Sequence, residues 1–239
     1  MNWKYLVGKA WSVVDKKLQR SNSTIIRKSY PYDRNWMLDV KRILNKDAQL
    51  IVDAGANIGS FSKELNFWFP NAEIYAFEPV KSTFNTLKQN TADQPQIQPF
   101  QHALGETAEK ITISLNSENT INSLKVELAD NPIGTEEISV IRLDNFLEQR
   151  HKNHIDILKI DVEGFEFEVL KGCGNLTIDC VFLEVGYVRE PTKVHFSDVE
   201  RYMEDLGYQL CGIYEIMRNF YDKKSLAYSN NLYIKKSLL

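Results

Sequence analysis

The chain has 239 residues, of which 43% are hydrophobic and 26% charged, and its formal net charge is −3. This composition is ordinary for a soluble globular protein with one large core, and the lack of a basic surplus excludes a general nucleic-acid binder. The three cysteines lack metal-ligand spacing, and no apolar run approaches the roughly 20 residues that span a bilayer. We therefore expect a cytoplasmic protein with free thiols.

The first segment is basic and amphipathic. Residues 1–28 contain five lysines and two arginines against one aspartate, and apolar residues recur at helical spacing from Trp3 to Leu18. Such a helix can pack on its own domain or on a second copy in a homodimer, or it can lie on a membrane surface or an acidic partner. We expect packing, with 1–46 as an N-terminal helical extension and 47–239 as the main domain.

The rest of the chain alternates between strands and helices, which predicts an α/β fold with a parallel sheet. The expected strands cover residues 50–54, 73–77, 97–103, 110–115, 137–143, 155–161, 180–185, 208–214 and 232–235, and the expected helices cover 34–46, 59–68, 80–90, 165–171 and 196–206. Strands 110–115 and 137–143 predict a hairpin-like insertion around a polar loop that contains Ser123. The last two strands are expected to pair antiparallel.

Residues 50–59 have the pattern of a buried strand, a tight glycine turn and the start of a helix. Gly55 has no side chain, so a ligand can approach the backbone closely, and the helix N-terminus offers N–H groups. A dinucleotide-binding turn needs a glycine where Asn57 stands. Asp53 would repel a pyrophosphate but suits an ammonium group. The turn therefore favours S-adenosylmethionine (SAM), with its amino-acid end and no phosphate.

A second acid stands at the end of the next predicted strand. Glu78 follows Asp53 by 25 residues, close to the spacing of about 20 residues at which an acid binds ribose hydroxyls in nucleotide-binding sheets. Its two oxygens can accept hydrogen bonds from adjacent hydroxyl groups. Pro79 ends the strand and keeps Glu78 extended. We therefore expect Glu78 to bind the ribose.

Ligands of open α/β sheets bind outside the carboxyl ends of the strands. The expected strands bring six polar residues to that edge: Asp53, Glu78, His102, Asp161, Glu163 and Glu184. Lys159 shares a strand face with Asp161, and a buried lysine needs an acidic partner or water. Glu184 on the next strand is the partner that we expect.

A hydroxyl that accepts a methyl group must lose its proton. The candidate bases are Asp161, Glu184, His195 and His102. Alternatively, Asp161 and Glu184 could hold a divalent cation such as Mg²⁺, which would acidify the hydroxyl. The sequence leaves both mechanisms open.

The chain resembles the FkbM-type methyltransferases. The matching pieces lie in the expected order at 52–59, 77–79, 102–105, 142–146, 158–164 and 182–185, and the run Lys-Ile-Asp-Val-Glu-Gly at 159–164 is the most specific. The resemblance implies a class I SAM-dependent fold, Rossmann-like, with a seven-stranded, mostly parallel sheet and helices on both faces. It also implies O-methylation of a hydroxyl on a sugar, a glycan or a polyketide-type natural product.

The resemblance implies roles for single residues as well. Asp53, Gly55, Asn57, Glu78 and His102 would line the cofactor, and Asp161 would face the reacting centre. With their neighbours Gly59, Pro79 and Ala103, the first five form the expected cofactor site, in which His102 lies near the adenine. Asp161, Glu184 and His195 form the expected catalytic set.

Two other classes of function are compatible with part of this evidence. A catalytically silent fold could bind SAM or a protein partner as a scaffold, and the acid cluster argues against it. A nicotinamide-dependent oxidoreductase would need the glycine that Asn57 replaces.

Overall fold

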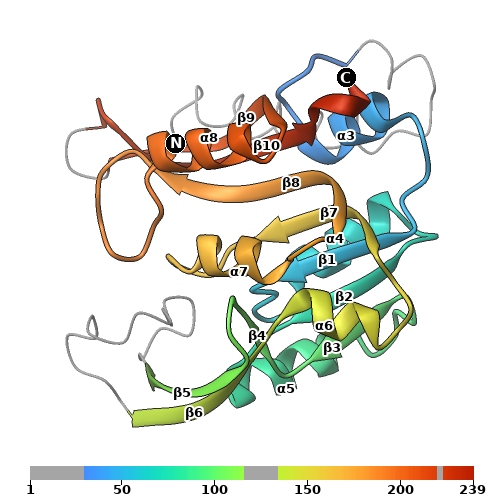
Figure 1. The fold of residues 1–239 in the computed structure, drawn as a ribbon, viewed down its shortest axis with the longest axis vertical. Coiled ribbons are helices and arrows are strands. Elements are labelled where there is room, and N and C mark those ends of the chain that lie inside the picture. Colours follow the sequence, from blue (N-terminus) through green and yellow to red (C-terminus); the bar gives the residue numbers. More distant parts are fainter. Residues whose placement is uncertain (1–29, 116–133, 220–222) are drawn as a thin grey trace, which may run out of the picture. The chain divides into compact units, whose positions relative to one another are not determined.

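The computed structural model describes residues 30–115, 134–219 and 223–239 (Figure 1). The chain divides into two compact units, Met1–Asn45 and Lys46–Leu239. In the first unit, α3 (Trp36–Leu44) begins after Asn35, whose side chain accepts a hydrogen bond from the Leu38 N–H at 3.0 Å. The predicted amphipathic helix within 1–28 lies outside the described residues and stays a prediction.

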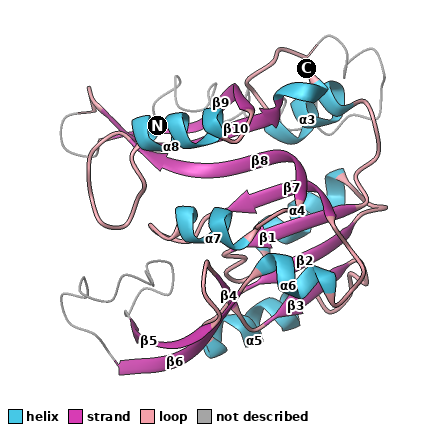
Figure 2. Cartoon of the chain, viewed as in Figure 1, coloured by secondary structure: helices cyan, strands magenta, loops and turns pink. Residues whose placement is uncertain are grey.

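The second unit is built around a seven-stranded sheet in the order β3-β2-β1-β7-β8-β10-β9 (Figure 2). Its strands are β1 (Leu50–Ala54), β2 (Glu73–Phe77), β3 (Ile97–Phe100), β7 (His154–Ile160), β8 (Thr177–Gly186), β9 (Tyr208–Arg218) and β10 (Leu226–Lys235). The pairings from β3 to β8 are parallel, whereas β10 pairs antiparallel with both of its neighbours. The mostly parallel sheet and the antiparallel last pair confirm the prediction.

Helices cover both faces of this sheet. They are α4 (Ser60–Trp68), α5 (Lys81–Asn90), α6 (Leu143–Glu148), α7 (Glu166–Gly172) and α8 (Phe196–Asp205), and a short 3₁₀ helix covers Lys236–Leu238. Apolar residues of α6, α7 and α8 pack with one face, which includes Val52 and Leu158. On the other face, the Phe61 ring of α4 stacks on Phe182 with 6.3 Å between ring centroids. Strands buried on both faces explain why their sequences are apolar almost throughout.

None of the described helices combines the length and the apolar character that crossing a bilayer requires.

The segment predicted as one strand over 97–103 forms two. β3 ends at Phe100, and β4 (Ala103–Leu104) joins a separate three-stranded sheet with β6 (Gly134–Ile141) and β5 (Glu109–Leu115). The Phe100 carbonyl accepts backbone hydrogen bonds from Glu78 at 3.1 Å and from His102 at 3.0 Å, which turns the chain out of the main sheet.

The predicted insertion is otherwise confirmed, since β5 and β6 pair antiparallel. The strand predicted over 137–143 ends earlier, at Ile141, because α6 begins at Leu143. Ser123 lies outside the described residues.

Candidate active site at the carboxyl edge of the sheet

The glycine turn after β1 has a backbone that only glycine accommodates. Gly55 has φ +77°, and a Cβ atom there would lie 1.8 Å from the Asp161 carbonyl oxygen. Gly59 also has positive φ, at +87°. The N–H groups of Gly55 and Ala56 both donate to the Phe77 carbonyl, at 3.1 and 2.9 Å. These two N–H groups are therefore used within the fold, and the N–H groups expected to be open to a ligand belong to the N-terminus of α4, which begins at Ser60.

The carboxylate of Asp53 lies against an ammonium group rather than at the surface. Asp53 is 0% exposed, and its Oδ1 lies 3.0 Å from Lys159 Nζ. The Ser62 hydroxyl donates to Oδ2 at 2.6 Å. Lys159 Nζ also donates to the Gly55 carbonyl at 2.9 Å. Asp53 and Lys159 thus connect two strands to the glycine turn and to α4.

The predicted ion pair between Lys159 and Glu184 is wrong. Lys159 lies in register with Asp53 on β1 and with Phe182 on β8, so Glu184 lies two residues further along its strand. Burial alone would lower the pKa of Lys159, but the charges of Asp53 and Asp161 raise it above its usual value. The lysine therefore stays charged inside the protein.

Glu78 lies at the end of β2, beside the glycine turn. Its Oε2 accepts a hydrogen bond from the Asn57 N–H at 3.2 Å, and its Oε1 accepts one from the Val80 N–H at 2.9 Å. Asn57 has φ +49°, and Pro79 is half-buried between Glu78 and Val80. Burial raises the pKa of Glu78 to about 7. The backbone orients the carboxylate and leaves each oxygen one further lone pair.

His102 lies next to Glu78, because both residues donate their N–H groups to the Phe100 carbonyl. Burial, and then the charge of Arg150, lower the pKa of the His102 imidazole. Its Nδ1 is buried, and among the described residues no group hydrogen-bonds to it. Ala103, the next residue, is buried in β4. A neutral ring with an unsatisfied nitrogen fits a ligand that carries polar ring atoms.

A second lysine, Lys193, contacts the carboxylates of Glu163, which follows β7, and of Glu184 in β8. Lys193, on the loop after β8, binds Glu184 and lies 3.5 Å from Glu163. Its Nζ also lies 4.7 Å from the centre of the Tyr228 ring. Asp161, with 44% of its side chain exposed, lies 3.7 Å from Lys159 Nζ. Burial raises the pKa of Glu163 to about 7 and also raises that of Glu184.

A third glutamate holds the turn that presents these groups. Glu166 accepts hydrogen bonds from the N–H groups of Gly164 at 3.1 Å and of Val162 at 3.4 Å. Glu163 and Gly164 have φ values of +53° and +99°. Burial raises the pKa of Glu166 to about 7. The turn is thus fixed by a carboxylate behind it, while Glu163 points to Lys193.

His195 caps a helix. It is the N-cap of α8, and its Nδ1 lies 2.8 Å from the Ser197 hydroxyl oxygen and accepts a hydrogen bond from the Ser197 N–H at 3.3 Å. Within the described residues, these contacts do not join it to Asp161 or Glu184. A catalytic role for His195 has no support from this placement.

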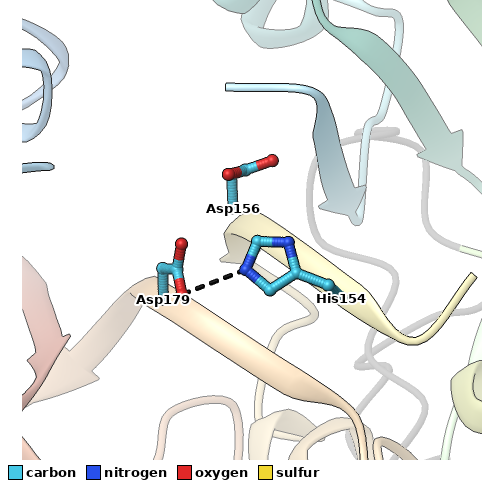
Figure 3. A group of neighbouring side chains, drawn as sticks. All are labelled: His154, Asp156 and Asp179. Atoms are coloured by element: carbon cyan, nitrogen blue, oxygen red, sulfur yellow. Dashed lines mark ion pairs between the residues drawn. The ribbon is translucent and has the colours of Figure 1, made fainter. Parts of the chain in front are cut away.

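Another charged group lies at the opposite, amino edge of the sheet (Figure 3). His154, Asp156 and Asp179 offer ligand atoms close enough for a metal ion. However, Lys46 Nζ lies 2.7 Å from Asp156 Oδ1 and 2.5 Å from Asp179 Oδ2. Asp156 Oδ2 accepts hydrogen bonds from the N–H groups of Gln49 and Leu50 at 2.8 and 3.0 Å. The lysine ammonium group already contacts both carboxylates, so we regard this group as structural.

Lysine ammonium groups also lie against Asp161 and Glu184, the residues predicted to hold Mg²⁺. Each carboxylate already contacts a lysine ammonium group, which takes the place beside its oxygens that a divalent cation would need. These two carboxylates therefore do not fit the predicted Mg²⁺ ion. A groove of about 540 Å³ beside α6 contains none of the predicted site residues.

The sequence did not predict a role at this edge for three residues, Ser62, Lys193 and Glu166. Ser62 is a small polar residue on the otherwise apolar face of a helix, which is a signal that could have been used. Lys193 and Glu166 lie in polar stretches, and only the fold shows that they contact Glu184 and the turn at Gly164.

Comparison with known proteins places the chain in a family. The Methyltransferase FkbM domain matches residues 53–210. "Methyltransferase 1" of Beauveria bassiana is 33% identical, over 68% of this chain and 73% of that protein. "Hexuronic acid methyltransferase AglP" of Haloferax volcanii is 28% identical, over 65% of each chain. "31-O-demethyl-FK506 methyltransferase FkbM" of Streptomyces tacrolimicus is also 28% identical, over 53% of this chain and 60% of the other.

Among solved structures, the precorrin-6y C5,15-methyltransferase of Geobacter metallireducens aligns with a TM-score of 0.47 and 14% identity, over 87% of this chain and 92% of that one. The family match decides against the nicotinamide-dependent oxidoreductase. The sheet order, the glycine turn and the matched family lead to one conclusion: the chain belongs to the FkbM-domain methyltransferases and is a SAM-dependent methyltransferase with a class I fold.

Proposed function

We propose that the chain transfers a methyl group from SAM to a hydroxyl group of a sugar, a glycan or a polyketide-type product. One observation carries this proposal. Asp161 lies beside the turn between β1 and α4, and the partly buried carboxylates of Glu163 and Glu184 share Lys193 near it. The names of two relatives support the class of acceptor, since one acts on a hexuronic acid and one on 31-O-demethyl-FK506.

The proposed cofactor site uses the ends of β1, β2 and β3. Glu78, oriented by two backbone N–H groups, would bind the ribose hydroxyls. His102, whose Nδ1 lacks a partner among the described residues, would lie at the adenine, beside Ala103. The wall of the proposed cofactor site would be formed by Gly55, Asn57, Gly59 and Pro79. Asp53 would act indirectly, because its carboxylate is enclosed by Lys159 and Ser62.

When bound, SAM supplies an activated methyl group, whose bond to sulfur breaks as the bond to the acceptor oxygen forms, with the electron pair left on sulfur. The chain must align the hydroxyl, exclude water and remove one proton. The Asp161 carboxylate is more exposed than that of Glu184, so we assign Asp161 the role of accepting the proton of the acceptor hydroxyl. Glu184, held by Lys193, would accept a hydrogen bond that orients the acceptor.

Calorimetry with SAM tests the cofactor site. Glu78→Ala should weaken SAM binding at least about tenfold, or about 1.4 kcal/mol. Glu73→Ala is the matched control, because Glu73 lies on the same strand at the other edge of the sheet and contacts Lys152. Equal affinities of the two variants would reject the ribose assignment, and no binding by the unaltered chain at millimolar SAM would reject the site.

Methyl transfer from radiolabelled SAM to a panel of sugars and polyketide alcohols tests the reaction. Asp161→Asn should lower kcat by about 100-fold or more and leave SAM affinity nearly unchanged, because it removes the proton acceptor. Asp205→Asn, at the end of α8, is the control. Unchanged turnover of Asp161→Asn would reject the role of Asp161.

A further inference from the structure

The cations of the carboxyl edge are already shared between acids. Lys159 lies 3.0 Å from Asp53 and 3.7 Å from Asp161. Lys193 contacts Glu184 directly and lies 3.5 Å from Glu163. Each ammonium group therefore contacts two carboxylates, and when all four acids are ionised they carry two charges more than the two lysines neutralise.

Lys193 is held in this arrangement from more than one side. Its side chain is only 14% exposed, and Glu184 and Glu163 are 13% and 24% exposed. The Tyr228 ring of β10 lies 4.7 Å from its Nζ. The lysine is thus a partly buried member of a built cluster, and it could bind an anionic ligand only by leaving its own carboxylates.

Further negative charge adjoins this cluster. Glu215, on β9, accepts a hydrogen bond at 2.6 Å from Asn230, and Asn230 lies in register with Glu184. The raised pKa values of Glu163 and Glu184 have burial as their main cause, and the neighbouring carboxylates add to both shifts. An additional anion would be repelled here, whereas hydroxyl groups would find several hydrogen-bond acceptors.

We propose that this carboxylate cluster, with Lys193 held between Glu163 and Glu184, selects acceptors whose reacting end is uncharged and rejects those that carry a carboxylate there. This inference rests on the proposed O-methyltransferase function and narrows its substrate class to neutral polyhydroxyl compounds, such as hexosides.

Matched acceptor pairs test the inference. Each pair differs by a CH₂OH group or a carboxylate at one carbon, as in a methyl hexoside and the corresponding methyl hexuronoside, with analogous pairs of polyketide alcohols. The neutral member should have the higher kcat/KM, by about tenfold, because one like charge near the cluster costs that much. The difference should shrink at high salt, because screening shortens the range of the repulsion.

Variants locate the cause of this preference. Glu163→Gln and Glu184→Gln each free part of Lys193, so each should shift the preference toward the carboxylated member by about threefold or more, even if total activity falls. Glu204→Gln is the matched control, because Glu204 is exposed on α8, where it contacts Lys236, and the change in charge is identical. It should leave the preference unchanged.

Binding of both members in the presence of S-adenosylhomocysteine, measured by saturation-transfer NMR, gives a readout independent of turnover. A preference for the carboxylated member, or a preference that Glu163→Gln and Glu184→Gln do not move, would overturn the inference and leave the proposed function intact. If no member of any pair binds or is methylated although SAM binds, the proposed acceptor class fails together with the inference.

Discussion

The two edges of the seven-stranded sheet carry charged clusters of opposite character. At the amino edge, Lys46 bridges Asp156 and Asp179, and two backbone N–H groups complete the bonding of Asp156. Although burial would raise the pKa of Asp156, the hydrogen bonds from Lys46, Leu50 and Gln49 lower it. The folded protein therefore stabilises the ionised form of this acid.

At the carboxyl edge, burial outweighs the hydrogen bonds and ion pairs in setting the pKa values of the acids. Burial raises the pKa values of Glu78, Glu163 and Glu166 to about 7, although each carboxylate has hydrogen-bond or ion-pair partners. These acids are incompletely compensated, which costs stability but leaves them able to bind hydroxyl groups or protons. The comparison teaches that a cluster of acids becomes a candidate site when its compensation is incomplete, and not because acids are close together.

The largest effect should come from the glycine turn. Gly55→Ala places a Cβ atom 1.8 Å from the Asp161 carbonyl oxygen on a backbone with φ +77°. We expect a loss of about 4 kcal/mol or more in the free energy of unfolding, together with loss of SAM binding. Urea denaturation and calorimetry measure both. As a control, Gly134→Ala should leave the free energy of unfolding nearly unchanged, since a Cβ atom there meets nothing within 4 Å. If Gly55→Ala cost equally little, the turn would be able to rearrange around the added Cβ atom.

The buried lysine comes next. Lys159→Met leaves the carboxylate of Asp53, 0% exposed, without its cation, and should cost about 3 kcal/mol. Lys46→Met at the amino edge should cost about 1 kcal/mol, because the Lys46 side chain is 42% exposed and water can replace it. Urea denaturation of both variants compares the edges directly. Equal costs would mean that burial of the lysine does not distinguish them.

Asp156→Asn tests the sign of the pH dependence at the amino edge. The folded pKa of Asp156 is below its usual 3.8, so its stabilisation is present above that value and is lost as the pH falls through the folded pKa. We expect a cost of about 2 kcal/mol at neutral pH, which diminishes toward pH 3. Denaturation curves across this range measure it, and a cost independent of pH would indicate a purely steric effect.

Glu166→Gln should show the opposite slope and the smallest effect. The folded pKa of Glu166 is about 7 against a usual 4.5, so its contribution to stability is present below 4.5 and is lost as the pH rises through 7. The glutamine resembles the protonated acid, so the variant should become more stable relative to the unaltered chain as the pH rises from 5 to 8, by about 1 kcal/mol or more at the upper end. Glu204→Gln, on an exposed position of α8, should show no such gain.

Much of the fold follows from local sequence. β1 and β2 have the bounds that the apolar runs predict, because each run is short and ends at a glycine or a proline. The prediction was wrong over 97–103, where the turn-forming residue, Pro99, lies inside β3 and not between Phe100 and Ala103, where β3 ends and β4 begins. A carbonyl at Phe100 shared by two N–H groups makes that break, and local sequence does not encode it.

The sequence by itself determined that acids follow the first strands, that Gly55 must turn the chain between Asp53 and α4, and that the family is the FkbM-domain methyltransferases. Only the tertiary structure decided which charges meet. Lys159 binds Asp53 because β1 lies beside β7 in that register, and Glu184 binds Lys193 because the loop after β8 folds back over its own strand. Ion pairs depend on distances across the sheet, and strand order and register set those distances.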